Sequence, residues 1–214
     1  MKRIWIIGGG RFGALALKRL SGIMTGARFT IVDPAGDGLE SMGGSGPELI
    51  ATDGVRFLTE HLDPESGPDW IIPALPVHLA AEWCLAKLGP ERAQRIEIPS
   101  EILSVLPNPM RGEGGDAYVS HANFICPDDC PEPAQICTAT GEPRKPNLFD
   151  VLRDTPFPEF HSRVIRSRQL GPGVGGYRPR QLFHLLNLLE KAKGNHLVST
   201  ACRCHGVLTG IARP

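Results

Sequence analysis

Short apolar runs alternate with amphipathic stretches through the first 105 residues. The apolar runs that predict strands are residues 3–7, 28–32, 49–52, 70–75 and 94–98. The stretches between them that predict helices are residues 11–24, a short segment ending near residue 62, and residues 77–88 before Gly89-Pro90. Strands that alternate with helices predict a parallel sheet with helices on both faces, which is an α/β fold.

The pattern changes after residue 106. Eleven prolines fall between Pro107 and Pro179, and because proline lacks an amide donor, such a stretch disfavours long helices and central strands. Its aromatic residues argue against a plain linker, so a compact, irregular segment held together by something such as a metal is expected. A helix over 179–193 and short strands over 196–201 and 207–211 follow. We therefore predict a Rossmann-like domain over 1–105 and a smaller cysteine-rich and proline-rich α+β domain over 106–214.

The glycine turn, residues 8–13, carries the most specific motif. Gly8, Gly10 and Gly13 match G-x-G-x-x-G between an apolar strand and an amphipathic helix. The first glycine permits the tight turn, the second lets a pyrophosphate approach the backbone, and the third lets the helix pack against the sheet. The free amides of a helix N-terminus then favour the phosphates. An empty glycine-rich turn in a similar fold is the alternative.

The second predicted strand ends in Asp33, where a carboxylate would accept the ribose hydroxyls of NAD and repel the 2′-phosphate of NADP. Arg11, inside the turn, would soften that preference. The predicted cofactor is NAD, and the candidate cofactor-binding residues are Gly8, Gly10, Arg11, Phe12, Gly13, Asp33 and Pro73.

This stretch resembles the NAD-binding domains of TrkA-type potassium-uptake regulators and the precorrin-2 dehydrogenase part of siroheme synthases. The residues that carry the resemblance are 6–13 and 29–33, and it covers only about the first hundred residues. The resemblance implies a dinucleotide-binding domain. It does not extend to the second half, so neither family's activity is carried over.

Five of the six cysteines form two groups: Cys126, Cys130 and Cys137, then Cys202 and Cys204 followed by His205. Clustered cysteines without a secretion signal more often bind metal or do redox chemistry than form disulfides. If the groups meet, they offer ligands for zinc or for an iron–sulfur cluster. Redox-active thiols and inert buried thiols are the alternatives, and Cys84, on a predicted helix, is expected in the core.

Two histidines are candidate catalytic residues. His78 follows the fourth predicted strand, at the edge where open α/β sheets bind ligands, and would point at a nicotinamide or substrate; the alternative is a helix cap. His121 lies five residues before Cys126 and would serve as a base or ligand; the alternative is a structural histidine.

The formal net charge is zero, which gives no reason to expect nucleic-acid binding. Residues 161–214 nevertheless hold nine Lys or Arg against one acid. Such an excess of basic residues is typical either of a solvated face or of a site that binds anions. Within them, the basic glycine-rich stretch 166–177 is either a phosphate or carboxylate cradle or a surface loop. No apolar run is long enough to span a membrane and no signal peptide is recognisable, which predicts a cytoplasmic protein.

Three functions follow as hypotheses. The first is an NAD-dependent oxidoreductase with a cysteine-ligated metal or iron–sulfur centre and a small-molecule substrate. The second is a non-catalytic NAD/NADH sensor that regulates a partner protein, as the TrkA resemblance implies. The third is a metal-handling or tetrapyrrole-related protein. A homodimer is left open.

Overall fold

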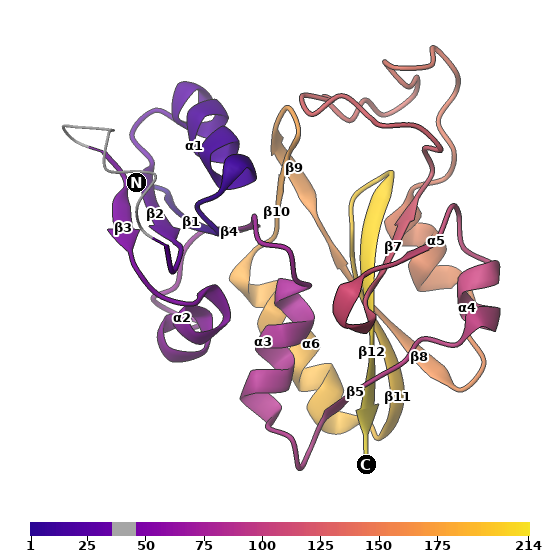
Figure 1. Cartoon of the computed structure of the whole chain (residues 1–214). Coiled ribbons are helices and arrows are strands. Elements are labelled where there is room, and N and C mark those ends of the chain that lie inside the picture. The colour runs from indigo at the N-terminus through magenta and orange to yellow at the C-terminus, as the bar shows by residue number, and fades with distance from the viewer. Residues whose placement is uncertain (36–45) are drawn as a thin grey trace.

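The computed structural model describes residues 1–35 and 46–214 and shows a mixed α/β protein. Its first part holds a four-stranded parallel sheet in the order β3-β2-β1-β4 (Figure 1). The bounds are β1 (Arg3–Ile7), α1 (Arg11–Ile23), β2 (Arg28–Val32), β3 (Glu48–Ile50), α2 (Gly54–His61), β4 (Trp70–Pro73) and α3 (Leu79–Leu88). The predicted parallel sheet is confirmed.

Helices cover both faces of this sheet because its strands are apolar on both sides. Ile4 and Ile6 of β1 pack in the same buried cluster as Leu17 of α1. Ile7 belongs to a second cluster, which includes Phe57 of α2 and extends into α3 and α6. Continuous apolar strands of this kind are expected where a parallel sheet is buried on both faces.

The second part is a larger sheet in the order β6-β7-β12-β11-β8, with β5 also paired to β12. The bounds of its strands are β5 (Gln94–Ile96), β6 (Met110–Arg111), β7 (Ala117–Ser120), β8 (Phe160–Arg166), β11 (Gly194–Ala201) and β12 (His205–Arg213). Its helices are α4 (Ser100–Ser104), the 3-10 turn Glu113–Gly115, α5 (Leu148–Asp154) and α6 (Pro179–Lys191). Here β11 and β12 form an antiparallel hairpin, and β8 lies at an edge, where a proline-rich segment can supply a strand.

One strand predicted for the parallel sheet belongs to the second sheet instead. Residues 94–98 were expected to complete the parallel sheet, but β5 pairs antiparallel with β12. The place beside β4 is taken by Tyr177, whose backbone exchanges hydrogen bonds of 2.9 and 3.0 Å with Ile71. The domain boundary at residue 105 stays a prediction.

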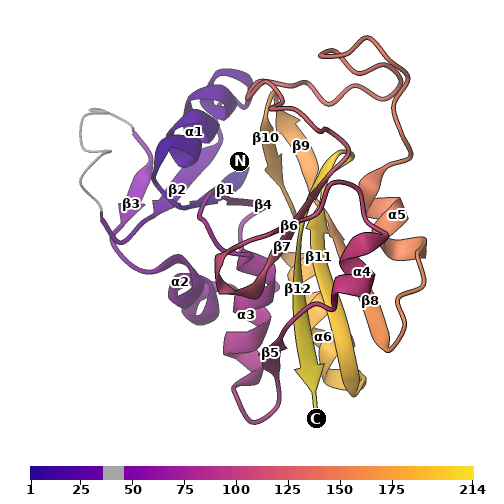
Figure 2. The same cartoon turned by 45° about the vertical axis from the view of Figure 1, so that its right-hand side comes forward.

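Two segments of the second part reach back to the first. The hairpin β9 (Arg168–Gly171) and β10 (Val174–Gly176) lies between α1 and the second sheet, and the segment 121–147, which holds no helix or named strand, extends above it (Figures 1 and 2). This arrangement brings the cysteine-bearing segment near the N-terminal helix. Among the described residues, no helix is long and apolar enough to cross a membrane.

Candidate functional site

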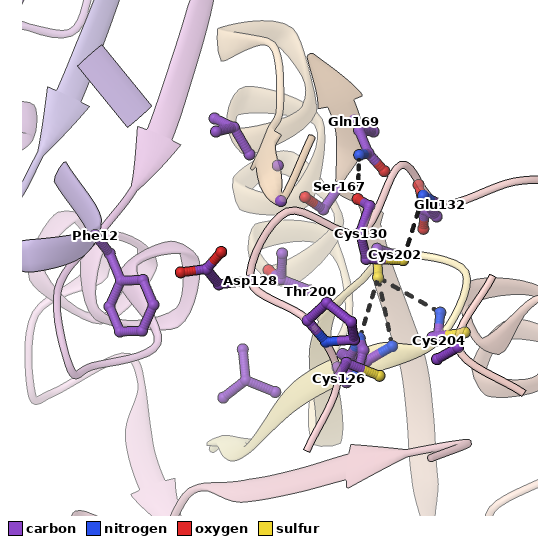
Figure 3. Close-up of a pocket in the computed structure, with 18 of the residues that line it drawn as sticks. Phe12, Cys126, Asp128, Cys130, Glu132, Ser167, Gln169, Thr200, Cys202 and Cys204 are labelled. Atoms are coloured by element: carbon purple, nitrogen blue, oxygen red, sulfur yellow. Dashed lines mark hydrogen bonds between the residues drawn. The ribbon is translucent and has the colours of Figure 1, made fainter. Parts of the chain in front are cut away.

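A cavity of about 460 Å³ lies between the glycine turn and the second sheet (Figure 3). Phe12 from the glycine turn lies on one side of it, and Asp128 lies between that ring and the cysteines. The cysteines in its wall are Cys126, Cys130, Cys137, Cys202 and Cys204. The two cysteine groups therefore share one cavity, although Cys137 and Cys202 lie 65 positions apart in the sequence.

The turn between β11 and β12 presents the second cysteine group. The Cys202 amide donates to the carbonyl of His205 at 2.9 Å, which closes the turn. The Cys202 sulfur accepts hydrogen bonds from the amides of Cys204 and His205, both at 3.4 Å. A two-stranded hairpin thus delivers two cysteines and a histidine to one end of the sheet.

The first cysteine group shows similar amide-to-sulfur contacts. The Cys130 sulfur accepts from the amide of Glu132 at 3.4 Å. Around Cys137, a turn is closed by the Gly141 amide, which donates to the Cys137 carbonyl at 2.8 Å. Hydrogen bonds from Thr140, with a further one from the amide of Ala139, lower the pKa of the Cys137 thiol.

Amides that point at sulfur favour the thiolate over the thiol. Hydrogen bonds to sulfur are also among the contacts that tune cysteine-ligated metal centres. Three of the five cavity cysteines, Cys130, Cys137 and Cys202, have this arrangement. Their local backbone is therefore suited to hold sulfur as an anionic ligand.

Burial acts in the opposite direction at three of the five thiols, Cys202 among them. It raises the pKa of Cys202 to about 12, with Glu132 adding to the effect, and raises the pKa values of Cys126 and Cys204. Arg144, whose Nη2 donates to the Cys204 sulfur at 2.6 Å, partly counters this by lowering the pKa values of Cys126 and Cys204. A cation in the cavity would favour the same thiolates far more strongly.

All six cysteines, each in the described part of the chain, are free thiols. In residues 1–35 and 46–214, no three Cys, His, Asp or Glu side chains are grouped tightly enough to hold a metal ion as they stand. The predicted ligands thus share a cavity without forming a ready coordination shell. Cys84 lies outside the cavity, fully buried in the core, where burial raises the pKa of its thiol.

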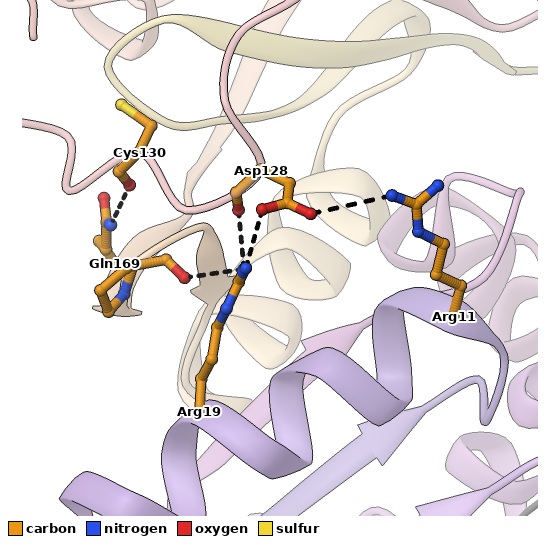
Figure 4. A network of polar contacts seen from close by, with 6 residues as sticks. Arg11, Arg19, Asp128, Cys130 and Gln169 are labelled. Carbon is orange, nitrogen blue, oxygen red and sulfur yellow. Dashed lines mark hydrogen bonds and ion pairs between the residues drawn. The ribbon is translucent and has the colours of Figure 1, made fainter.

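Polar contacts attach the segment around Asp128 to α1 (Figure 4). Arg19 donates to the Asp128 carbonyl at 2.7 Å and to its carboxylate at 2.8 Å, and also to the Pro172 carbonyl at 3.2 Å. Arg11, the first residue of α1, lies 3.8 Å from the same carboxylate. Gln169 adds a bond of 2.7 Å to the Cys130 carbonyl. The glycine turn and the first cysteine group are therefore linked through one aspartate.

Two of the three motif glycines in the glycine turn leave no room for a side chain. Gly8 has a φ of +107°, and a Cβ there would overlap the backbone of Ala74. A Cβ on Gly13 would overlap the Gly8 carbonyl oxygen, whereas around Gly10 no described atom lies within 4 Å of a Cβ. The first and third glycines of the motif are thus packed against the backbone, whereas the middle glycine, Gly10, has space beside it.

The remaining predicted cofactor residues lie at the same edge of the parallel sheet. Asp33 directly follows β2, and its carboxylate accepts from the amides of Gly9 at 2.7 Å and Ala35 at 2.9 Å. Pro73 is the last residue of β4 and pairs with Ile7. Helix α1 has no side-chain cap and no acid in its first turn, so its N-terminal amides remain available for an anion.

The two candidate histidines lie outside the cavity wall. His78 precedes α3, is 2% exposed, and is bonded to the hydroxyls of Thr200 and Thr209 rather than to backbone amides of the helix. His121 Nε2 lies 2.8 Å from the Pro146 carbonyl, and its Nδ1 is buried without a partner among the described residues. The side chain of His78 is one hydrogen bond away from the cavity residue Thr200. His121 reaches a cavity residue only through its backbone amide, which donates to the carbonyl of Cys204 at 2.9 Å.

Sequence reasoning missed Arg144 and the polar residues around His78. Arg144 lies in a stretch of mixed prolines and charges that carries no motif. Thr200 and Thr209 are ordinary strand residues, and nothing in a single sequence pairs them with a histidine more than 120 residues earlier.

The family match covers α3 and the second part of the chain. Residues 80–213 match the family AF_1314_C, described as "Uncharacterized protein, C-terminal domain", and since this is more than half of the chain, the chain belongs to that family. An "Uncharacterized protein" of Archaeoglobus fulgidus is 31% identical over 149 residues, or 68% of this chain and 66% of the relative. The alignment thus spans just under two thirds of that relative. No solved structure matches the chain. The family match contains all five cavity cysteines and excludes the glycine turn.

Proposed function

We propose that this protein is an oxidoreductase that binds NAD at the glycine turn and holds a metal ion or iron–sulfur cluster on the cavity cysteines. The observation that carries the proposal is the shared cavity: its wall includes five cysteines and Phe12 of the glycine turn. A nicotinamide beside a redox-active centre is an arrangement suited to hydride or electron transfer.

Three features support a dinucleotide at the glycine turn. The strand order β3-β2-β1-β4 is that of the first half of a doubly wound dinucleotide-binding sheet with one strand beyond its switch point. The space at Gly10 and the uncapped start of α1 would accept a pyrophosphate. Asp33, at the carboxyl end of β2, would accept the ribose hydroxyls of NAD and repel the extra phosphate of NADP.

The donor set supports a metal centre. Four of the five cavity cysteines would satisfy either zinc or an iron–sulfur cluster, and amides already point at three of the sulfurs. Because no three ligands are grouped now, binding would draw the segment 126–137 toward the turn 202–204. A cluster would supply one-electron chemistry, whereas zinc would polarise a bound oxygen or hold the segment in place.

The contact at Asp128 favours a second candidate, a dinucleotide sensor. An anion at the start of α1 would compete with Asp128 for Arg11 and so change how the cysteine segment is held. A sensor of this kind would bind NADH without consuming it.

The dinucleotide proposal is tested by fluorescence titration with NADH and NADPH. NADH should bind more tightly than NADPH. Gly10→Ala should weaken NADH binding by about tenfold or more, since a methyl group would occupy the space for the pyrophosphate. Gly22→Ala, at an open position on the same helix, is the matched control and should bind like the wild type. Equal, weak binding of both nucleotides by all three proteins would overturn the proposal.

Anaerobic reduction separates the two candidates. Protein purified without oxygen is mixed with NADH, and its spectrum is followed with the NADH absorbance. A brown sample that bleaches while NADH is consumed supports the oxidoreductase. Binding of NADH to a colourless zinc protein, with the nucleotide left intact across added carbonyl compounds, favours the sensor.

A further inference from the structure

A chain of four buried polar groups leads from the cavity wall into the protein. Thr200, on β11, lines the cavity, and its hydroxyl oxygen lies 2.9 Å from Nε2 of His78. Nδ1 of His78 lies 2.8 Å from the hydroxyl oxygen of Thr209, and that hydroxyl donates to Asp116 at 2.5 Å. None of the four residues is more than 9% exposed.

The direction of these hydrogen bonds is set at the Asp116 end. Asp116 is paired with Arg95 at 2.5 Å, so its ionised carboxylate can only accept. Thr209 therefore gives its single hydroxyl proton to Asp116 and accepts one from Nδ1 of His78. In the neutral ring, Nε2 is then bare and accepts from Thr200. Each proton in the chain points away from the cavity.

This polarity leaves a hydrogen-bond acceptor at the cavity wall. Because the Thr200 proton is directed at His78, the oxygen of Thr200 can only accept a proton from a ligand. At the far end, Arg95 also pairs with Glu82, and these two side chains are 28% and 30% exposed, so that a proton reaching Asp116 lies close to solvent. The hydrogen bonds therefore run without interruption from the cavity wall to a partly exposed ion pair.

We propose that Thr200, His78, Thr209 and Asp116 form a proton relay that removes the hydroxyl proton of an alcohol bound in the cavity. This inference rests on the proposed function, because it needs the dinucleotide as the hydride acceptor. The substrate class is a primary or secondary alcohol, which is oxidised to the aldehyde or ketone.

The carbinol C–H bond breaks, and its electron pair leaves as hydride for the oxidised nicotinamide, while a C=O bond forms. The alcohol proton passes to the Thr200 oxygen as the Thr200 proton passes to Nε2 of His78. The Nδ1 proton of His78 passes to Thr209, and the Thr209 proton passes to Asp116. His78 remains neutral and changes tautomer, and Asp116 ends protonated, so the negative charge that it had beside Arg95 is neutralised.

The neutral ring that this relay needs fits its surroundings. Burial lowers the pKa of His78 to about 4; Asp116 opposes this shift, and Arg95 adds to it. A ring already charged at neutral pH would have no free nitrogen to accept the proton from Thr200.

The polarity is tested directly by the tautomer of His78. In a long-range proton–nitrogen spectrum of the wild-type protein labelled with ¹⁵N-histidine, His78 should carry its proton on Nδ1. The resonance is assigned by its loss in His78→Gln. A proton on Nε2, or a doubly protonated ring at neutral pH, would overturn the relay, and this measurement requires neither nucleotide nor substrate.

The relay's role is tested with NAD⁺ and a panel of primary alcohols, secondary alcohols and 2-hydroxy acids, with NADH formation as the readout. Thr209→Val, which keeps the side-chain shape and removes the hydroxyl, should lower kcat about 100-fold with little change in KM for NAD⁺. Thr209→Ser should recover most of that loss. Thr59→Val, which removes a hydroxyl bonded only within α2, is the matched control and should match the wild type.

The outcomes separate the two proposals. NADH binding without oxidation of any alcohol by the wild type contradicts the relay's substrate class, and oxidation that Thr209→Val slows less than threefold contradicts the relay itself. Absence of NADH binding contradicts the proposed function and, with it, the alcohol oxidation, whereas the His78 tautomer tests the polarity of the hydrogen-bond chain independently of both.

Discussion

The parallel sheet and the cysteine-bearing segment 121–147 are held in place by different means. The sheet is held by close packing: a side chain on Gly8 or Gly13 would overlap the backbone, and aliphatic residues are buried on both faces of the sheet. The segment has no helix or named strand, and it is attached to α1 and the β9-β10 hairpin by a few polar contacts. Small backbone changes should therefore break the first region, whereas single side chains should control the second.

The largest effect is expected at Gly13. In Gly13→Ala the new methyl group would overlap the Gly8 carbonyl, which separates α1 from β1 and lowers the free energy of unfolding by roughly 3 kcal/mol. Urea unfolding followed by circular dichroism measures this. Gly22→Ala, on the same helix with open space around it, should cost nothing and could stabilise the protein slightly. Equal stability of the two variants would show that close packing at the turn does not hold the sheet.

Low pH should destabilise the protein through buried histidines at the second sheet. His78 and His196, the two histidines that are buried among the described residues, both contact its strands, and burial lowers the pKa of each to about 4. Below the unfolded-state pKa of 6.5, these histidines bind protons in the unfolded chain but stay neutral in the folded chain. The free energy of unfolding therefore falls as the pH drops from 6.5 toward 4. For His78 alone the loss is on the order of 3 kcal/mol.

Unfolding free energies at pH 7 and pH 4.5 test this dependence. His78→Gln should reduce the difference between the two values, although the variant is less stable at pH 7. His184→Gln, at an exposed position on α6, should keep the wild-type difference. A wild-type stability that does not change over this range would contradict the account of His78 as a buried neutral ring.

A smaller effect is expected at Arg19. Arg19→Ala removes the contacts to Asp128 and Pro172, and a loss of about 1 kcal/mol should be confined to the cysteine-bearing segment. Hydrogen exchange should then become about fivefold faster in residues 121–147, with the parallel sheet unchanged. Arg56→Ala, which breaks an exposed ion pair on α2, should leave global stability and that exchange almost unchanged. Faster exchange throughout the chain in Arg19→Ala would contradict the distinction between the two regions.

The same distinction explains what the sequence could predict. The strands and helices of the first part follow from local apolar periodicity, and the glycine turn follows from a local motif. The pairing of β5 with β12 does not follow from local sequence, because it depends on Tyr177 occupying the place beside β4. The cysteines could be proposed as a group from their residue type alone, but their common cavity depends on contacts such as Arg19 with Asp128, more than a hundred residues apart. The relay through His78 depends entirely on such long-range contacts.

We propose that the two cysteine groups form one centre, and metal analysis of anaerobically purified variants shows whether both groups are needed to hold it. We expect bound iron or zinc to be lost almost completely both in Cys126→Ser/Cys130→Ser and in Cys202→Ser/Cys204→Ser, while Cys84→Ser keeps the wild-type content. A wild-type protein without bound metal, or metal that each double variant retains, would contradict it.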